Sequence, residues 1–581
     1  MASTYSFHTS LPILLLSSFL LLLSPSLSDV APSTPVTPVT ACNSTTDPTF
    51  CRSVLPPRGS QNLYTYSRFS LAKSLSNARK FLKTVDRYLS RRSALSHTAI
   101  NALEDCQLLA ELNIDFLVSA SSTANSSSTL LDPQTDKLQT LLSALLTNQQ
   151  TCLDGLQAAT SSWSVKNGLS APLSNGNKLY SVSLSLFNRA WVKKKPKKAR
   201  NVSVPPKEVP VPNGRKLLFH EVDVGRRGDS GLPVKISSRA GRDLYERSGR
   251  RLLQSSSDAV LVSDIVVVSQ DGTGNFTTIT DAVSSAPNKT DGSSGYYLIL
   301  VTAGVYQEYV LIPKYKRYLM MVGDGINQTV VTGDHNNIDG WTTFKSATFA
   351  VVGQGFVAVN MTFQNTAGPA KHQAVAVRNG ADQSTFYSCS FEGYQDTLYT
   401  HSMRQFYKSC DIYGTVDYIF GNAAVVFQDC NIYSRLPMQG QSNTITAQGR
   451  TDPGQNTGTS IQDCNIAAAA DLAADVGGST RTYLGRPWKE YSRTVIMQSR
   501  MDGLIDSAGW LPWNETFALS TLYYAEFDNS GPGSDTSGRI SWPGYHVISN
   551  STEALNYTVT SFVFGDNWLP QTGVPYSSGL L

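Results

Sequence analysis

The stretch Phe386–Ala423, FYSCSFEGYQDTLYTHSMRQFYKSCDIYGTVDYIFGNA, contains two similar blocks. The cysteines of the two blocks, Cys389 and Cys410, are 21 residues apart, and Asp396 and Asp417 have the same spacing. Repeats of about this length, built from short strands and turns, are typical of a parallel β-helix, in which each coil stacks on the previous one. Residues one period apart then lie on neighbouring strands, about 4.8 Å apart.

The repeat has one consequence for the cysteines and another for the carboxylates. Disulfides need Cα atoms roughly 4.4–6.8 Å apart, so we predict a bond between Cys389 and Cys410. Two aspartates that reach into one cleft acquire different pKa values, so that one is charged while the other is protonated. Asp396 and Asp417 therefore form a candidate pair of acid and nucleophile.

Two further copies of the cysteine block, around Cys430 and Cys464, extend the repeat towards the C-terminus. The successive cysteine steps are 21, 20 and 34 residues, which predicts an insertion in the last coil. A second disulfide between Cys430 and Cys464 is left open. A β-sandwich also has short strands, but the single-coil period favours a β-helix.

The N-terminus carries a candidate targeting segment. The apolar run Leu11–Leu23 is followed by small residues, which is typical of a signal peptide spanning 1–28. It is shorter than the roughly 20 apolar residues of a membrane helix, and an uncleaved anchor is the alternative. Eight cysteines and ten Asn-x-Ser/Thr sequons agree with a secreted, disulfide-bonded glycoprotein.

The charge of the chain is divided unevenly along its length. Residues 1–253 contain 31 Lys and Arg against 16 Asp and Glu, a net charge of +15, whereas residues 254–581 contain 17 against 28, a net charge of −11. This change marks a domain boundary, and the whole-chain value of +4 describes neither part.

The region 29–191 is expected to be an all-α domain. Apolar residues at three- and four-residue spacing predict four helices within 62–190, which suggests a four-helix bundle. A Cys106–Cys152 disulfide would join two helices, and Cys42–Cys51 would close an N-terminal hairpin. We find no catalytic constellation among these residues.

The segment 192–253 is expected to be an exposed basic linker. Two tetrapeptides within it are candidate cleavage sites for a protease of the secretory pathway, and an ordinary linker is the alternative. Nucleic acid is not an expected partner of a secreted chain. The candidate processing residues are Arg215, Lys216, Leu217, Leu218, Arg250, Arg251, Leu252 and Leu253.

Several motifs of the region 254–581 resemble those of the plant pectin methylesterases, carbohydrate esterase family 8. They occur in family order and comprise Gly304–Glu308, Gly323–Gly325, Gln373–Ala376, Gly393–Tyr399, Gly414–Gly421 and Leu484–Trp488. Tyr418 stands where the family usually has Phe, a difference that should alter packing rather than chemistry. The N-terminal region is similar to the invertase and pectin methylesterase inhibitor domain. The resemblance implies an all-β, right-handed parallel β-helix preceded by an all-α pro-domain.

The resemblance also implies roles for five residues. Asp417 is the nucleophile that attacks the methyl ester at C6 of galacturonate, and Asp396 is the acid that protonates departing methanol and then the base that activates water. Gln373 and Gln395 stabilise the oxyanion, Gln373 also contacting substrate. Arg486 keeps Asp417 ionised and contacts substrate as well.

Further expectations concern substrate and partners. Trp488 and Thr343 would contact the sugar, and neither a metal ion nor a cofactor is implied. The substrate would be methylesterified homogalacturonan in the plant cell wall, and the mature enzyme would be a secreted monomer. Separate inhibitor proteins are further candidate partners. The pro-region would inhibit the enzyme, assist its folding, or both.

Two alternatives from other classes remain. The chain could be an invertase or pectinesterase inhibitor, or a wall-binding protein, with a non-catalytic β-helix, but the intact pair Asp396 and Asp417 argues against this. A serine esterase would need a Gly-x-Ser-x-Gly elbow between a strand and a helix, which the sequence lacks.

Overall fold

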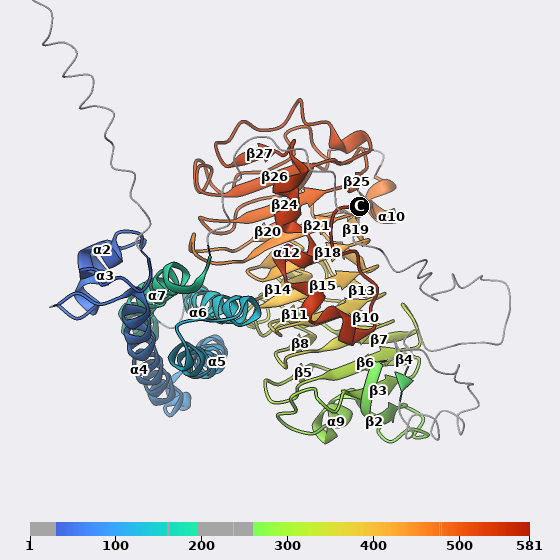
Figure 1. Ribbon diagram of the computed structural model, residues 1–581. Coiled ribbons are helices and arrows are strands. Elements are labelled where there is room, and N and C mark those ends of the chain that lie inside the picture. Colours follow the sequence, from blue (N-terminus) through green and yellow to red (C-terminus); the bar gives the residue numbers. More distant parts are fainter. Residues whose placement is uncertain are drawn as a thin grey trace, which may run out of the picture.

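The computed structural model describes residues 31–57, 59–159, 163–193, 236–237, 260–475, 477 and 479–581. The predicted signal peptide and both processing motifs lie outside the described residues. A helical domain packs against one flank of a column of coils, which runs from green to red in Figure 1. Within the ranges given above, no helix is long and apolar enough to cross a membrane.

The N-terminal domain is the expected four-helix bundle. Four long helices share one apolar core that includes Leu71, Leu117, Leu142 and Phe187, as the three- and four-residue spacing predicts. The four long helices are α4 (Leu63–Leu89), α5 (His97–Ser126), α6 (Asp132–Ala158) and α7 (Trp163–Trp191). Two short helices precede them, α2 (Pro38–Cys42) and α3 (Pro48–Val54).

Both predicted disulfides of this domain are present. Cys42–Cys51 joins α2 to α3 with a Cα separation of 5.6 Å. Cys106–Cys152 joins α5 to α6 with a Cα separation of 4.7 Å. The second bond fixes two of the helices that face the β-helix.

The rest of the described chain forms a parallel β-helix with three sheets, and every strand pair in them is parallel. The twelve-stranded sheet contains β1 (Ile236–Ser237), β2 (Val260–Val268), β3 (Tyr296–Val301), β6 (Leu319–Gly323), β9 (Val357–Val359), β12 (Ser384–Tyr387), β15 (Arg404–Lys408), β18 (Ala424–Gln428), β21 (Gly458–Gln462), β24 (Arg493–Met497), β26 (Tyr523–Phe527) and β27 (Tyr545–Val547).

The other two sheets complete each coil. The eight-stranded sheet contains β4 (Gly304–Gln307), β7 (Thr329–Gly333), β10 (Thr362–Asn365), β13 (Ser390–Glu392), β16 (Asp411–Gly414), β19 (Asn431–Ser434), β22 (Asn465–Ala468) and β25 (Arg500–Met501). The seven-stranded sheet contains β5 (Val310–Ile312), β8 (Phe349–Val351), β11 (Val377–Asn379), β14 (Leu398–Thr400), β17 (Ile419–Gly421), β20 (Asn443–Gln448) and β23 (Thr482–Gly485). Short helices α9 (Ile279–Ser285), α10 (Ala470–Ala473), α11 (Ser551–Ala554) and α12 (Val559–Phe562) lie outside the sheets.

The 21-residue repeat is one coil of this β-helix. Phe386 lies beside Tyr407 in the twelve-stranded sheet, and Leu398 lies beside Ile419 in the seven-stranded sheet. Inside the coils the Phe386 and Tyr407 rings stack with centroids 5.1 Å apart, and the next ring, Phe427, follows at 4.7 Å. The predicted period and fold class are confirmed.

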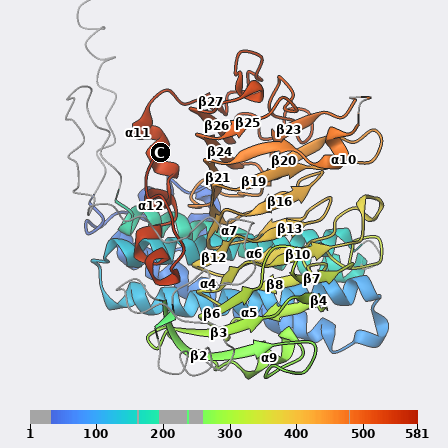
Figure 2. The ribbon, with the colours of Figure 1, turned by 90° about the vertical axis from the view of Figure 1, so that its right-hand side faces the viewer.

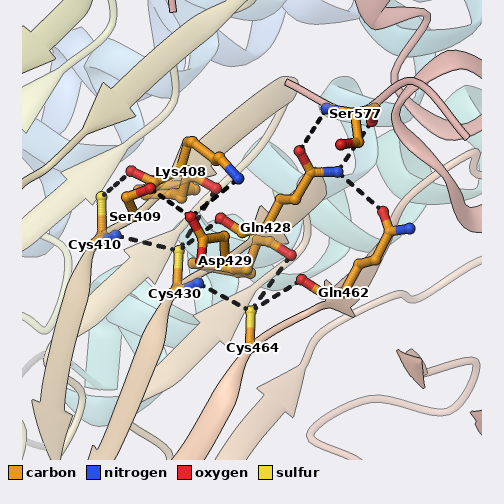
Figure 3. Close-up of polar contacts among 11 residues, drawn as sticks. Lys408, Ser409, Cys410, Gln428, Asp429, Cys430, Gln462, Cys464 and Ser577 are labelled. Atoms are coloured by element: carbon orange, nitrogen blue, oxygen red, sulfur yellow. Dashed lines mark hydrogen bonds and ion pairs between the residues drawn. The ribbon is translucent and has the colours of Figure 1, made fainter. Parts of the chain in front are cut away.

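The predicted Cys389–Cys410 disulfide is wrong, and the Cys430–Cys464 bond, which was left open, is not formed. All four cysteines are buried free thiols. Figure 3 shows three of them in consecutive coils, where the Cys430 amide N–H donates to Cys464 Sγ at 3.4 Å. Neighbouring side chains in a parallel register point the same way at about 4.8 Å, whereas disulfides hold their Cβ atoms about 3.8 Å apart. The spacing therefore satisfied only the Cα criterion.

Helices α5 and α6 pack over the seven-stranded sheet, and Figure 2 shows them crossing behind the coils. One apolar cluster joins Leu103 and Leu156 of these helices to Phe344, Tyr399 and Phe420 of the β-helix. The two domains thus share a continuous apolar contact on this face.

We expect four free thiols in the full chain. Alkylation of the unfolded chain without a reductant should add four groups, and peptide mapping should place them on the β-helix cysteines, because the helical-domain cysteines are bonded. Intact-mass spectrometry measures the number. A chain that takes up two alkyl groups or none would show that disulfides do form between coils.

Candidate active site

Asp396 and Asp417 occupy equivalent positions in neighbouring coils. Each lies two residues before a strand of the seven-stranded sheet, β14 or β17, and these strands pair in register. Both have left-handed backbone conformations, with φ of 65° and 54°. Asp tolerates this region better than most residues. The stacking therefore aims both carboxyl groups at one region.

Asp417 is held by a cation and a hydroxyl group. Arg486 donates from Nε to Oδ1 at 2.8 Å and from a terminal nitrogen to Oδ2 at 2.7 Å. Thr444 donates from Oγ1 to Asp417 Oδ1 at 2.6 Å and accepts from the Asp417 backbone N–H at 2.9 Å. Such bidentate, charge-assisted contacts fix the orientation of the carboxylate.

Asp396 has a different environment. It is only 7% exposed, and within the described chain no donor binds its carboxyl group. Burial, followed by the negative charge of Asp417, raises the pKa of Asp396 well above its usual value, although Arg486 opposes the shift. The two carboxyl groups therefore differ in the way that an acid and a nucleophile require.

A cavity of about 460 Å³ surrounds the pair. It brings together all seven residues for which the sequence analysis expected a role. They are Thr343, Gln373, Gln395, Asp396, Asp417, Arg486 and Trp488. Residues up to 145 positions apart in the sequence thereby line one cavity. Thr343 to Asp417 precede their strands of the seven-stranded sheet, whereas Arg486 and Trp488 follow β23.

Several lining residues were missed by the sequence analysis. Tyr399 and Phe420 stack at 4.2 Å, one coil apart, and Trp488 meets Phe420 edge-on at 5.9 Å. Trp513 lies 4.5 Å from the Arg486 guanidinium. The repeat could have indicated Tyr399 and Phe420, which are 21 residues apart, but nothing in it marks Trp513.

The helical domain supplies the roof of the cavity. The roof residues lie on or beside α5 and α6, and they are Asp105, Thr151, Asp154, Gly155, Gln157 and Ala158. Thr342 donates to Asp105 Oδ2 at 2.5 Å, and Lys489 contacts Asp154 at 3.0 Å. The sequence analysis found no functional residues in this domain, and the apolar periodicity of the helices gives no sign of these contacts.

Metal ligands were also sought. Among the described residues, no group of three or more His, Cys, Asp or Glu is arranged to hold a metal ion.

Comparison with known proteins places the two domains in two families. Residues 265–566, just over half of the chain, match the pectinesterase family, and residues 37–186 match the plant invertase/pectin methylesterase inhibitor family. A probable pectinesterase/pectinesterase inhibitor 41 from Arabidopsis thaliana is 58% identical, over 93% of this chain and 94% of the relative. Pectinesterase 1 from Citrus sinensis is 46% identical, over 85% and 79%.

A solved structure extends the comparison to the fold. Pectin methylesterase from carrot is 54% identical with a TM-score of 0.53, and the match covers 56% of this chain and all of the carrot chain. This chain therefore belongs to the pectinesterase family.

Proposed function

We propose that the chain hydrolyses methyl esters of galacturonate units in pectin, with Asp417 as nucleophile and Asp396 as acid and base. The observation that carries this proposal is the unequal environment of two carboxyl groups in one cavity. Asp417 is gripped by Arg486 and Thr444, while Asp396 is buried without a donor. An ionised and a protonated carboxyl group are thereby available together.

In the first half of the reaction, an Asp417 oxygen attacks C6 of the ester. The amide N–H groups of Gln373 and Gln395 stabilise the negative oxygen that forms. As the bond to the methoxy group breaks, Asp396 donates its proton and methanol departs. The product of this step is an acyl-enzyme in which C6 is bonded to Asp417.

In the second half, Asp396 is an ionised base. It takes a proton from water, and the resulting hydroxide attacks C6. The bond to Asp417 breaks, the unit is left in the pectin chain with a free carboxyl group, and Asp396 is again protonated. Trp488 offers an aromatic face to the sugar and Thr343 contacts it. The net reaction consumes one water molecule and releases one methanol.

The helical domain is proposed to be an inhibitory cap. Its residues roof the catalytic cavity, and Thr151 lies 3.0 Å from His401 Nε2 across the contact. A polymer cannot lie along a cleft whose roof is packed with side chains. A folding role for the domain is compatible with the same contacts.

The remaining parts of the proposal concern delivery. The chain is secreted to the plant cell wall, a secretory-pathway protease cleaves at Arg215–Leu218 and Arg250–Leu253, and the mature enzyme is a monomer that separate inhibitor proteins can bind. The charge boundary at residue 253 and the signal-like N-terminus support this route.

The inhibitor alternative is less well supported. The inhibitor-family match covers only the helical domain, whose cavity-facing side is already occupied by its own β-helix. The complete set of catalytic residues in the β-helix favours an enzyme.

Replacement of Asp417 tests the catalytic assignment. In the chain 254–581, we expect Asp417→Ala and Asp417→Asn to lower methanol release from methylated pectin at least about a thousandfold, because the nucleophile is lost. Asn at position 417 tolerates the left-handed backbone conformation there, as Asp does. Asp411→Ala, on the eight-stranded sheet of the same coil, is the control and should stay active. Retained activity in both Asp417 variants would refute the assignment.

The cap is tested by preventing cleavage. A full chain with Arg215, Lys216, Arg250 and Arg251 replaced by Ala should release little methanol, while the chain 254–581 should be active, because only the latter has an open cleft. Methanol release at equal protein concentration is the measurement. Comparable rates from the two proteins would show that the helical domain is not inhibitory.

The cap should weaken as the pH rises. Burial raises the pKa of Asp105 to about 7 and that of Asp136 to about 6, against the opposing effects of Thr342 and Arg404. The capped state therefore favours the protonated carboxyls. The contribution of these two carboxyls to capping is greatest below the ordinary Asp pKa of about 3.9 and is progressively lost as pH rises through about 6 and 7.

This pH dependence can be measured on the uncleaved chain. The rate relative to that of the chain 254–581 should increase between about pH 4 and pH 7. Asp105→Asn, which cannot ionise, should reduce the increase. A relative rate that falls over the same range would contradict the sign of the effect.

A further inference from the structure

The ion pairs between the two domains all have the same polarity. Within the described residues, each one joins an acidic side chain of α5 or α6 to a basic side chain of the β-helix. The pairs are Glu104–Lys345, Glu111–Lys314, Asp115–Lys314, Asp136–Arg404 and Asp154–Lys489. The overall charges predict the reverse, since residues 254–581 carry a net charge of −11. Basic side chains are thus concentrated on the covered face of an acidic domain.

Two of these cations border the catalytic cavity. Lys345 follows the lining residues Thr342, Thr343 and Phe344, and Lys489 directly follows Trp488. The ammonium group of Lys489 lies 4.8 Å from the centroid of the Trp488 ring. Both cations are therefore placed where a polymer in the cleft would pass.

The two lysines lie on opposite sides of the carboxyl pair. Lys345 precedes β8 and Lys489 follows β23, while Asp396 and Asp417 precede β14 and β17. In the strand order of the sheet, β8 is two strands from β14, and β23 is two strands from β17. At about 4.8 Å per strand, the strand next to each lysine is about 10 Å along the β-helix from the strand next to the nearer aspartate.

Each of the two lysines depends on the helical domain for its anion. The Lys345 side chain is 27% exposed and contacts Glu104 as well as Asn101 Oδ1, both on α5. The Lys489 side chain is 19% exposed and contacts Asp154 at 3.0 Å. Within the described chain, neither pairs with an acidic residue of the β-helix. Departure of the helical domain removes both counter-ions and exposes both ammonium groups to solvent, where another anion can bind them.

We propose that Lys345 and Lys489 are binding sites for the free carboxylates of de-esterified galacturonate units on either side of the ester under attack. Glu104 and Asp154 occupy these sites in the capped chain. This inference rests on the proposed function, because it names the form of pectin that the same cleft prefers. Each turnover creates one more free carboxylate, so a partly de-esterified chain is bound better than a fully methylated one.

Binding of a de-esterified oligogalacturonate to the chain 254–581 tests the proposal without requiring activity. The match to carrot pectin methylesterase covers the whole of the carrot chain. A 54% identical β-helix of this extent is therefore found without a helical domain in the same structure. We expect Lys345→Gln and Lys489→Gln each to raise the calorimetric Kd about threefold to fivefold, since a partly exposed ion pair is lost. The double variant should lose at least about tenfold.

The matched control is Lys408→Gln. Lys408 pairs with Asp429 at 3.1 Å on the twelve-stranded sheet, away from the cleft, so its replacement should leave the Kd unchanged. All variants should keep the melting temperature of the parent chain. In parallel, kcat/KM for methanol release should fall for partly de-esterified pectin and change little for highly methylated pectin.

The outcomes separate this inference from the proposed function. If the double variant binds the oligogalacturonate as tightly as the parent, the lysine sites are overturned, even when methylated pectin is still hydrolysed. If binding weakens as expected but the parent releases no methanol from any pectin, the carboxylate sites stand and the esterase proposal fails.

Discussion

In a parallel β-helix, the backbone of each strand pairs with the coil before it and the coil after it, so the register fixes where every side chain of a coil can lie. In this protein the register passes without a shift from Phe386 to Tyr407 and from Leu398 to Ile419. The aromatic stack inside the coils and the two aspartates at the sheet edge both follow from it. A change in the length of this coil would move the two carboxyl groups apart. The pair would then be lost, as it is when either aspartate is replaced.

The stacking brings two like charges together, and the surroundings then distinguish them. Arg486 and Thr444 come from coils on the far side of Asp417, so they reach that carboxylate and leave Asp396 without a donor. The helical domain adds to the burial of both carboxyl groups, because its residues line the same cavity. The two aspartates therefore have different electrostatic surroundings because they lie in different coils of the β-helix.

The repeat made the fold and the carboxyl pair predictable, since a period of one coil brings residues together whatever lies between them. It failed where the coils differ in length. Thr444 lies 27 residues after Asp417 rather than 21, so the period does not point to it. The cysteine bond was predicted wrongly, because spacing determines how far apart two Cα atoms are but not the direction of their side chains. The docking of the helices was missed, because apolar spacing in α5 and α6 does not distinguish residues that face the bundle from residues such as Leu103 and Leu156 that also join the β-helix cluster. The polar residues beside them look like those of a solvated surface.

The proposed mechanism requires a protonated Asp396 beside an ionised Asp417 in one cavity. Infrared difference spectroscopy of the uncleaved chain at neutral pH tests this most directly, because the helical domain then covers the cavity and a protonated carboxyl group has its own C=O stretching band. We expect a band from a buried, protonated carboxyl group that disappears in Asp396→Asn and remains in the control variant Asp411→Asn. A band that persists in Asp396→Asn and disappears in Asp417→Asn would contradict it.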